Sequence, residues 1–343
     1  FGVCCLMKIT DHLSQVQLGT PQRHGDISVF PLFDFQQPDL AYQTMDPSLM
    51  RGDLEINEIS QGGEVPLLEA TNRLDQYILL LDSEEIRGAK QNRVLNTSIL
   101  LPEKSRTTIP VSCTESGRWE YATAGFQPSG TMMPKKSRTN KMKSVTSTTQ
   151  KIALACAAGA PAPPVACCYS SDQSEVWDDV ACLQAETHVS SSTSAMSDVY
   201  EAMADKIKKI TAKFDLHQNQ KGLLVMKDGE IMGFDLLSKS EAYAELHEKL
   251  LGSYVMDSTA EQEPHVRQEI DEQALASTFL QEAATAEGDQ HESVGKGTDV
   301  RFKTETLSGS ALMHDEQVVH TSFLRSEPQP PHAPDLPPIQ LPD

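Results

Sequence analysis

The sequence has no long apolar run and comparatively little positive charge, and both absences exclude classes of protein. No stretch approaches the ~20 consecutive apolar residues that span a bilayer, so a transmembrane helix is excluded. The 343 residues include 29 Lys and Arg against 49 Asp and Glu, which gives a formal net charge of −20. A nucleic-acid binder needs a basic face to neutralise phosphates, so neither nucleic acid nor membrane is expected as a partner of this acidic protein.

The cysteines and histidines also lack the spacing of a metal site. The seven cysteines are odd in number and include two vicinal pairs, without C-x-x-C or zinc-type spacing. The histidines are scattered, and no D-x-D-x-D-G calcium loop occurs. The sequence therefore predicts no metal-ligand motif, and its cysteine usage favours a reducing compartment. We expect a cytoplasmic protein.

The first half of the chain reads as short strands separated by turns. Apolar residues make up 38% of the sequence, enough to build a core. Alternating or short apolar runs predict strands at 27–33, 54–59, 65–70, 77–81, 94–101 and 107–111. This β-rich half has the pattern of a sandwich or an open barrel.

The second half changes to helical spacing with hairpins. Apolar residues from Met203 to Phe214 recur every three or four positions, which predicts a helix. Asp228-Gly229 predicts a tight hairpin turn between 222–226 and 231–236. A capping box at 238–241 predicts a second helix that ends at Gly252. Segments 300–306 and 318–324 are expected to pair as a last hairpin, so the fold class is α+β.

Composition predicts five segments along the chain. Residues 135–151 hold six basic residues and no acidic one, and a Pro/Ala-rich stretch follows, which together predict a mobile insertion. The segments are an N-terminal extension (1–14), the β-rich part of one domain (15–134), the insertion (135–170), the α+β part of the same domain (171–325) and a Pro-rich disordered tail (326–343).

A polar stretch from Asp82 to Asn96 joins two apolar strands and supplies most of the candidate site. Arg93 and Lys90 suit a phosphate or carboxylate, and Gln91, Asn92 and Asn96 suit hydroxyls or an amide. Glu85 is a candidate base or Mg²⁺ ligand, so the cofactor stays open. The alternative is a polar turn whose side chains satisfy their own backbone.

Two further stretches add candidates. If a strand continues past Val111, Cys113 and Glu115 point to one face, with Arg118 and Trp119 close behind. Glu115 is the second candidate catalytic carboxylate. A nucleophilic Cys113 is disfavoured, because Glu115 would raise the pKa of its thiol and no histidine lies nearby in sequence. Asp172 and Gln173 are candidate ligand contacts, although helix capping explains much of that stretch.

Several of these blocks carry a family resemblance. They are Gly-Ala-Lys-Gln-Asn-Arg at 88–93, Ser-Cys-Thr-Glu-Ser-Gly-Arg-Trp at 112–119, Ser-Asp-Gln at 171–173 with Val-Trp at 176–177, and Gly-Ser-Ala-Leu at 309–312. With them the chain resembles the ADP-ribosylglycohydrolase- and rhodanese-phosphatase-associated protein domain family over roughly residues 15–325. The resemblance implies a role in NAD or ADP-ribose metabolism and carries no assigned reaction.

Two hypotheses of different classes follow. In the first, the polar blocks bind, and in a catalytic version hydrolyse, an ADP-ribose-like or other phosphorylated nucleotide. Arg93, Lys90 and Arg118 would hold anionic groups, Asn92 and Asn96 would contact ribose hydroxyls, and Trp119 would stack. In the second, the blocks form internal polar networks of a non-enzymatic interaction module. Convergence on one open pocket favours the first, and a buried satisfied network favours the second.

Overall fold

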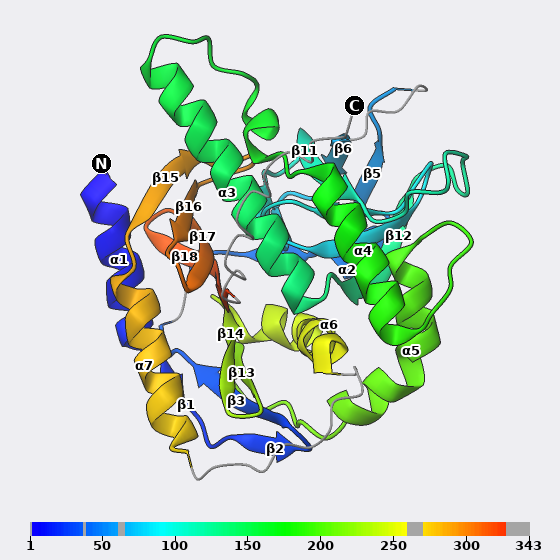
Figure 1. The fold of residues 1–343 in the computed structure, drawn as a ribbon. Helices are drawn as coiled ribbons and strands as arrows, with labels where there is room; N and C mark the ends of the chain where they lie inside the picture. The colour runs from blue at the N-terminus through cyan, green and yellow to red at the C-terminus, as the bar shows by residue number, and fades with distance from the viewer. Residues whose placement is uncertain (1, 37–38, 61–65, 259–269, 327–343) are drawn as a thin grey trace, which may run out of the picture.

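The structure is a computed structural model that describes residues 2–36, 39–60, 66–258 and 270–326. Figure 1 shows strands gathered into sheets, with helices between and outside them. The predicted α+β class is confirmed by this mixture of helices and strands. The helices are α1 (Gly2–Ser14), α2 (Met45–Arg51), α3 (Lys135–Ala157), α4 (Gln173–Thr187), α5 (Met196–Thr211), α6 (Ser240–Ser258) and α7 (Glu272–Thr285), with a 3₁₀ helix η1 (Val165–Tyr169).

A nine-stranded antiparallel sheet combines the first and last strands of the described chain. Its order is β1-β3-β13-β14-β18-β17-β16-β15, with β2 also paired to β3. These strands are β1 (Gln17–Leu18), β2 (Gln22–His24), β3 (Ile27–Phe33), β13 (Gly222–Lys227), β14 (Glu230–Leu237), β15 (Gly288–Glu292), β16 (Thr298–Lys303), β17 (Leu307–His314) and β18 (Gln317–Arg325). The two halves of the sequence therefore share one sheet.

Two smaller sheets are built from the β-rich first half. The six-stranded sheet has the order β12-β8-β9-β11-β6-β5, and the three-stranded sheet has the order β10-β7-β4. Their strands are β4 (Tyr42–Thr44), β5 (Leu54–Glu58), β6 (Leu67–Asn72), β7 (Tyr77–Leu80), β8 (Glu84–Gly88), β9 (Arg93–Leu95), β10 (Ile99–Leu101), β11 (Arg106–Cys113) and β12 (Phe126–Met132).

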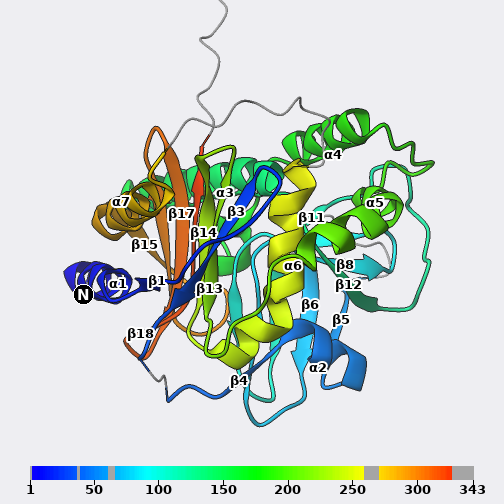
Figure 2. The same ribbon diagram turned by 90° about the horizontal axis from the view of Figure 1, so that it is seen from below.

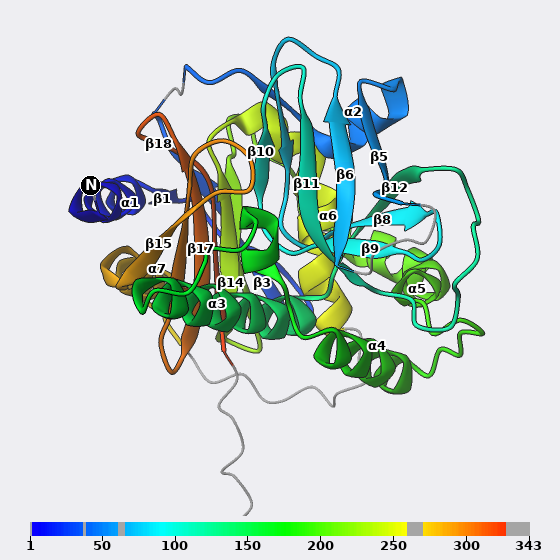
Figure 3. The same cartoon turned by 90° about the horizontal axis from the view of Figure 1, so that it is seen from above.

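The sheets and helices pack in layers. Helices α1 and α7 cover the outer face of the nine-stranded sheet, where Leu13 and Phe279 belong to the same core cluster as Phe30. Helix α6 lies between this sheet and the smaller sheets, as Figure 2 shows, and its Tyr243 and Leu250 belong to the central core. Helices α4 and α5 form a separate core cluster with residues of β9 and of the connection between β12 and α3. This cluster lies beside the six-stranded sheet (Figure 3).

Most of the predicted elements are confirmed. Strand β3 matches its predicted limits, and the Asp228-Gly229 turn joins β13 to β14 with positive φ angles of 50° and 80°. The predicted helix at 203–214 is α5, which begins earlier, at Met196. The predicted strand at 94–101 is two strands, β9 and β10, separated by the polar residues Asn96 to Ser98. The predicted tail lies outside the described residues, except for Ser326.

The prediction of a mobile insertion is wrong for residues 135–157, which form helix α3. Its basic residues are not a solvated run, because Lys135, Arg138 and Lys141 are buried on one face at three-residue spacing. Composition counts these side chains as polar, but inside the protein acidic groups from other elements match the charges of Arg138 and Lys141, and Lys135 donates to the Arg325 carbonyl. The N-terminal segment, predicted as an extension, likewise forms a packed helix, α1.

Two local predictions in the second half are also wrong. Segments 300–306 and 318–324 do not pair with each other, because β17 lies between β16 and β18 and pairs with both. Strand β17 is rich in small residues, and Gly309 leaves room for the ring of Phe323, whose Cδ1 would lie 2.4 Å from an added Cβ. Helix α6 also continues through Gly252 to Ser258 instead of ending there.

Candidate functional site

The residues from Gly88 to Arg93 form the turn between β8 and β9. Positive φ angles of 121° at Gly88 and 42° at Ala89 reverse the chain. The Asn92 side chain closes the turn, because its Oδ1 accepts from the Gly88 N–H at 3.2 Å and its Nδ2 donates to Ser197 Oγ at 3.1 Å. The turn is thus fixed by Asn92 and by helix α5.

Arg93 is the most deeply buried charge of this turn, with an exposed fraction of 0%. Its Nη1 donates to Gln91 Oε1 at 3.3 Å and to the Asn92 carbonyl at 3.4 Å. Its Nη2 lies 3.8 Å from Glu58 Oε1. Within the part of the chain that the structure describes, Arg93 Nε and Nη2 and both Glu58 carboxylate oxygens have no hydrogen-bond partner. Burial lowers the pKa of Arg93, and nearby acidic groups oppose this effect.

Cys113 lies beside Arg93 at the end of β11. Its Sγ donates to Gln91 Oε1 at 3.2 Å. Its backbone is held by the Gln173 side chain, which accepts from the Cys113 N–H at 2.8 Å and donates to the Cys113 carbonyl at 2.9 Å. Burial raises the pKa of the Cys113 thiol to about 11, although the Arg93 charge works in the other direction. We call Glu58, Gln91, Arg93 and Cys113 the Arg93 centre.

Glu115 and Arg118 form a closed ion pair next to the Arg93 centre. Glu115 Oε2 accepts from Arg118 Nη2 at 2.6 Å and from the Asn92 N–H at 3.1 Å, and Oε1 accepts from Arg118 Nε at 2.9 Å. Burial alone would raise the pKa of Glu115, but these hydrogen bonds outweigh burial and lower the pKa. Arg118 Nη1 also donates to the Ala89 carbonyl at 2.8 Å, which ties this loop to the turn.

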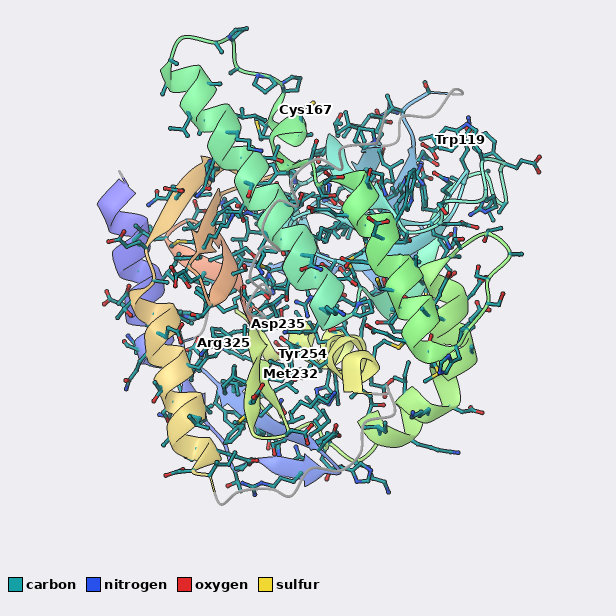
Figure 4. The ribbon with its side chains drawn as sticks, viewed as in Figure 1. Trp119, Cys167, Met232, Asp235, Tyr254 and Arg325 are labelled. Carbon is teal, nitrogen blue, oxygen red and sulfur yellow. The ribbon has the colours of Figure 1, made fainter. Side chains whose placement is uncertain are left out.

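The outer edge of this region carries two exposed aromatic rings. Lys90 Nζ lies 5.0 Å from the Trp119 ring and 5.3 Å from the Tyr121 ring, both within the range of a cation–π contact. Trp119 is 46% exposed, and Figure 4 shows it near the edge of the molecule. Exposure therefore rises from Arg93 through Arg118 to Trp119.

Three predicted site residues lie elsewhere. Glu85 accepts from Thr114 Oγ1 at 2.8 Å and from Thr131 Oγ1 at 3.0 Å, on the opposite face of the sheet from Cys113 and Glu115. Burial raises the pKa of Glu85. Asn96 bonds Ser112 and the Tyr169 carbonyl. Asp172 caps helix α4 by accepting from the N–H groups of its first turn. The structure thus separates Glu85 from Glu115. The side chains of Glu85, Asn96 and Asp172 are hydrogen-bonded to other groups of the protein.

A second group of buried charges lies at the centre of the molecule and was missed by sequence reasoning. Arg138 on α3 pairs with Asp235 on β14 through bonds of 2.6 Å and 3.1 Å, and Tyr254 on α6 donates to Asp235 at 2.8 Å. Lys141, one turn further along α3, pairs with Asp82. Figure 4 places Asp235 and Tyr254 at the middle of the fold. The sequence did contain one signal of this group, because Asp235 is an acidic residue within an otherwise apolar stretch of strand.

One part of this central group has the order of a catalytic triad. Ser98 Oγ lies 2.9 Å from His320 Nδ1, and His320 Nε2 lies 3.6 Å from Asp235 Oδ1. Ser98 is only 4% exposed, and Asp235 is already paired with Arg138. Because the Asp235 carboxylate is already committed to Arg138, these contacts indicate an interior network that joins the residue before β10 to β14 and β18.

No metal cluster accompanies the Arg93 centre in the described ranges. No group of three or more His, Cys, Asp or Glu side chains there could hold a metal ion. A cavity of about 240 Å³ lies elsewhere, between the segment Leu216–Gln220 and the start of α6. None of the helices in the described parts of the chain is long and apolar enough to cross a membrane.

The fold and these polar blocks define an α+β protein with a buried arginine–carboxylate centre beneath exposed aromatic rings. The chain matches the family model of the ARG and Rhodanese-Phosphatase-superfamily-associated Protein domain over residues 15–324, and it belongs to that family. The resemblance predicted from the sequence is therefore confirmed. Comparison with curated proteins and with solved structures gives no match.

Proposed function

We propose that this protein binds an ADP-ribose-like or other phosphorylated nucleotide ligand at the Arg93 centre and the adjoining Trp119 ring. The observation that carries the proposal is that Glu58 and Arg93 lie side by side and that both have polar atoms without a hydrogen-bond partner among the described residues. A buried polar group without a hydrogen bond costs about 1–3 kcal/mol, and more when it is charged. A ligand that supplies the missing partners would recover this energy on binding.

The surrounding groups suit the two ends of such a ligand. Arg93 offers N–H groups to a phosphate, and two further cations lie nearby: Arg118, which is paired with Glu115, and Lys90, which lies beside the Trp119 ring. Trp119 has an exposed ring on which a base could stack. The family's description names an association with ARG, the ADP-ribosylglycohydrolases, which supports a ligand of this chemistry.

The second candidate function is a non-enzymatic interaction module, and a specific observation favours it. Glu85, Asn96 and the central Arg138–Asp235 pair are buried and bonded internally. Such networks fix a fold without binding a ligand. The two proposals differ in one measurable property, which is ligand binding near Trp119.

The test uses the two tryptophans of the chain, Trp119 and Trp177. In a Trp177→Phe variant all tryptophan fluorescence comes from Trp119, and titration with ADP-ribose, NAD or inorganic phosphate should change it. The matched Trp119→Phe variant keeps Trp177, on α4, and should show no change. Thermal unfolding gives a second readout, because a ligand at about 100 times its Kd adds about 2.7 kcal/mol and raises Tm by a few degrees.

Arg93→Gln should abolish the response to these ligands, whereas Arg106→Gln should not. Arg106 is an exposed arginine on β11 whose nearest acid, Glu69, is 3.7 Å away. If no compound changes either fluorescence or Tm in the unmodified protein, the ligand proposal fails and the interaction module becomes the better account.

A further inference from the structure

Glu58 is an unusual carboxylate and was not selected from the sequence. It is the last residue of β5, and its side chain is only 4% exposed. The ionisable groups near it come from other strands. Arg93 Nη2 on β9 lies 3.8 Å away, and the Cys113 thiol on β11 is also close enough to interact electrostatically. The fold of the six-stranded sheet, and not sequence proximity, places Glu58 in the Arg93 centre.

The hydrogen-bonding capacity left open at this pair can be counted. A guanidinium has five N–H groups, and those of Arg93 Nη1 are directed to Gln91 and Asn92. The Nε–H and the two Nη2–H groups are left without an acceptor among the described residues. Both oxygens of Glu58 likewise have no donor in that part of the chain. Three donors and a whole carboxylate therefore lie side by side.

This combination selects against simple ions. A free anion would satisfy Arg93 but would be repelled by Glu58 and leave its oxygens without a donor. A cation would satisfy Glu58 but would be repelled by Arg93 and leave its N–H groups without an acceptor. A vicinal diol suits the carboxylate, because its two hydroxyls donate to the two oxygens, and a phosphate on the same sugar suits the guanidinium. In dinucleotide-binding folds a carboxylate hydrogen-bonds the 2′-hydroxyl of a ribose.

We propose that Glu58 binds the 2,3-diol of a ribosyl phosphate while Arg93 binds an oxygen acceptor of the same ligand. This assignment rests on the proposed function and narrows it to ribose-containing ligands. Glu58 thereby becomes a residue that selects ribose over deoxyribose.

The experiment compares ribose 5-phosphate with 2-deoxyribose 5-phosphate by isothermal titration calorimetry on the full chain. Hydrogen bonds to a charged group are strong, so loss of one hydroxyl should weaken binding by about tenfold to a hundredfold. In the Glu58→Gln variant, which keeps the size of the side chain, this ratio should fall to about threefold or less. The matched control is Glu55→Gln on the same strand, whose carboxylate is 46% exposed and pairs with Arg73, and it should keep the wild-type ratio.

The two sugars in unmodified protein test the inference even if Glu58→Gln fails to fold. Equal affinity for both sugars would overturn the assignment of Glu58, while leaving phosphate-ligand binding at Arg93 intact. Binding of neither sugar, together with no response to ADP-ribose, would overturn both proposals. A ratio that survives unchanged in folded Glu58→Gln would place the diol on another residue.

Discussion

At the scale of single residues, Cys113 lies beside a guanidinium but should be an unreactive thiol. Burial raises its pKa from 9.0 to about 11. The thiolate is the reactive form, so a rise of about two pKa units leaves roughly a hundredfold less of it at pH 8. We expect an alkylating reagent at pH 8 to modify the exposed Cys182 and leave Cys113 unmodified, as measured by mass spectrometry of the peptides.

The unfolded protein provides the control for this labelling. In urea both cysteines lose their surroundings, so both should be modified at similar rates. Modification of Cys113 in the folded protein as fast as Cys182 would contradict the assignment of a buried, protonated thiol.

The sequence predicted the local half of the Arg93 centre but not the distant half. Strand alternation predicted Cys113 and Glu115 on one face; β11 ends at Cys113, and both groups influence the pKa of Arg93. It could not predict that Glu85 points away, since the register between β8 and β9 decides that. Glu58 was missed because the order β9-β11-β6-β5 brings it in from a strand far away in sequence.

At the scale of elements, helix α3 is held in place by buried charge. Arg138 is 1% exposed and bonds Asp235, so its removal would leave a buried carboxylate without its main partner. Breaking a buried ion pair on one side typically costs about 3–5 kcal/mol. We expect Arg138→Ala to lower the free energy of unfolding by about that amount, measured by urea denaturation.

Lys136 gives a matched control on the same helix. It pairs with Glu186 at 3.0 Å, but both side chains are more than 40% exposed. Exposed pairs contribute about 0–1 kcal/mol. Lys136→Ala should therefore change stability by less than about 1 kcal/mol, and an equal loss in both variants would refute the distinction between buried and exposed charge on α3.

The start of α4 combines two functions in neighbouring residues. Asp172 caps the helix, while the Gln173 side chain forms hydrogen bonds with both the N–H and the carbonyl of Cys113. Gln173→Ala should loosen the end of β11 and increase the rate of Cys113 alkylation, even where Tm changes little. Asp172→Ala should cost about 1 kcal/mol of stability without that increase. Equal labelling rates in the two variants would show that Gln173 does not position Cys113.

At the scale of the whole molecule, the central charges connect parts of the chain that the sequence could not relate. Asp235 on β14 contacts groups from α3, α6 and β18. The nine-stranded sheet similarly pairs β3 with β13, although nearly the whole β-rich half lies between them in sequence. Periodicity predicts an element and its buried face, but it contains no information about which distant element pairs with it. The α+β class was therefore predictable, and the shared sheet was not.

The same central charges predict how stability responds to acid. Burial alone would raise the pKa of Asp235, but Arg138 and His320 outweigh it and hold this pKa well below its ordinary range. The folded state then binds fewer protons at Asp235 than the unfolded state, whose Asp titrates near pH ~3.9, so this stabilisation is present at neutral pH and lost in acid. Glu84 and Glu85 act in the opposite direction, because burial raises their pKa.

Comparison with Asp235→Asn separates these opposing contributions. The variant cannot titrate at position 235, so its difference in unfolding free energy from the wild type isolates the Asp235 carboxylate. That difference should be largest near pH 7 and should shrink as the pH falls from about 5 to 3, measured by urea unfolding at each pH. Glu84 and Glu85 are present in both proteins and cancel in the comparison. A difference that stays constant over this range would mean that Asp235 is not held ionised by Arg138 in the folded protein.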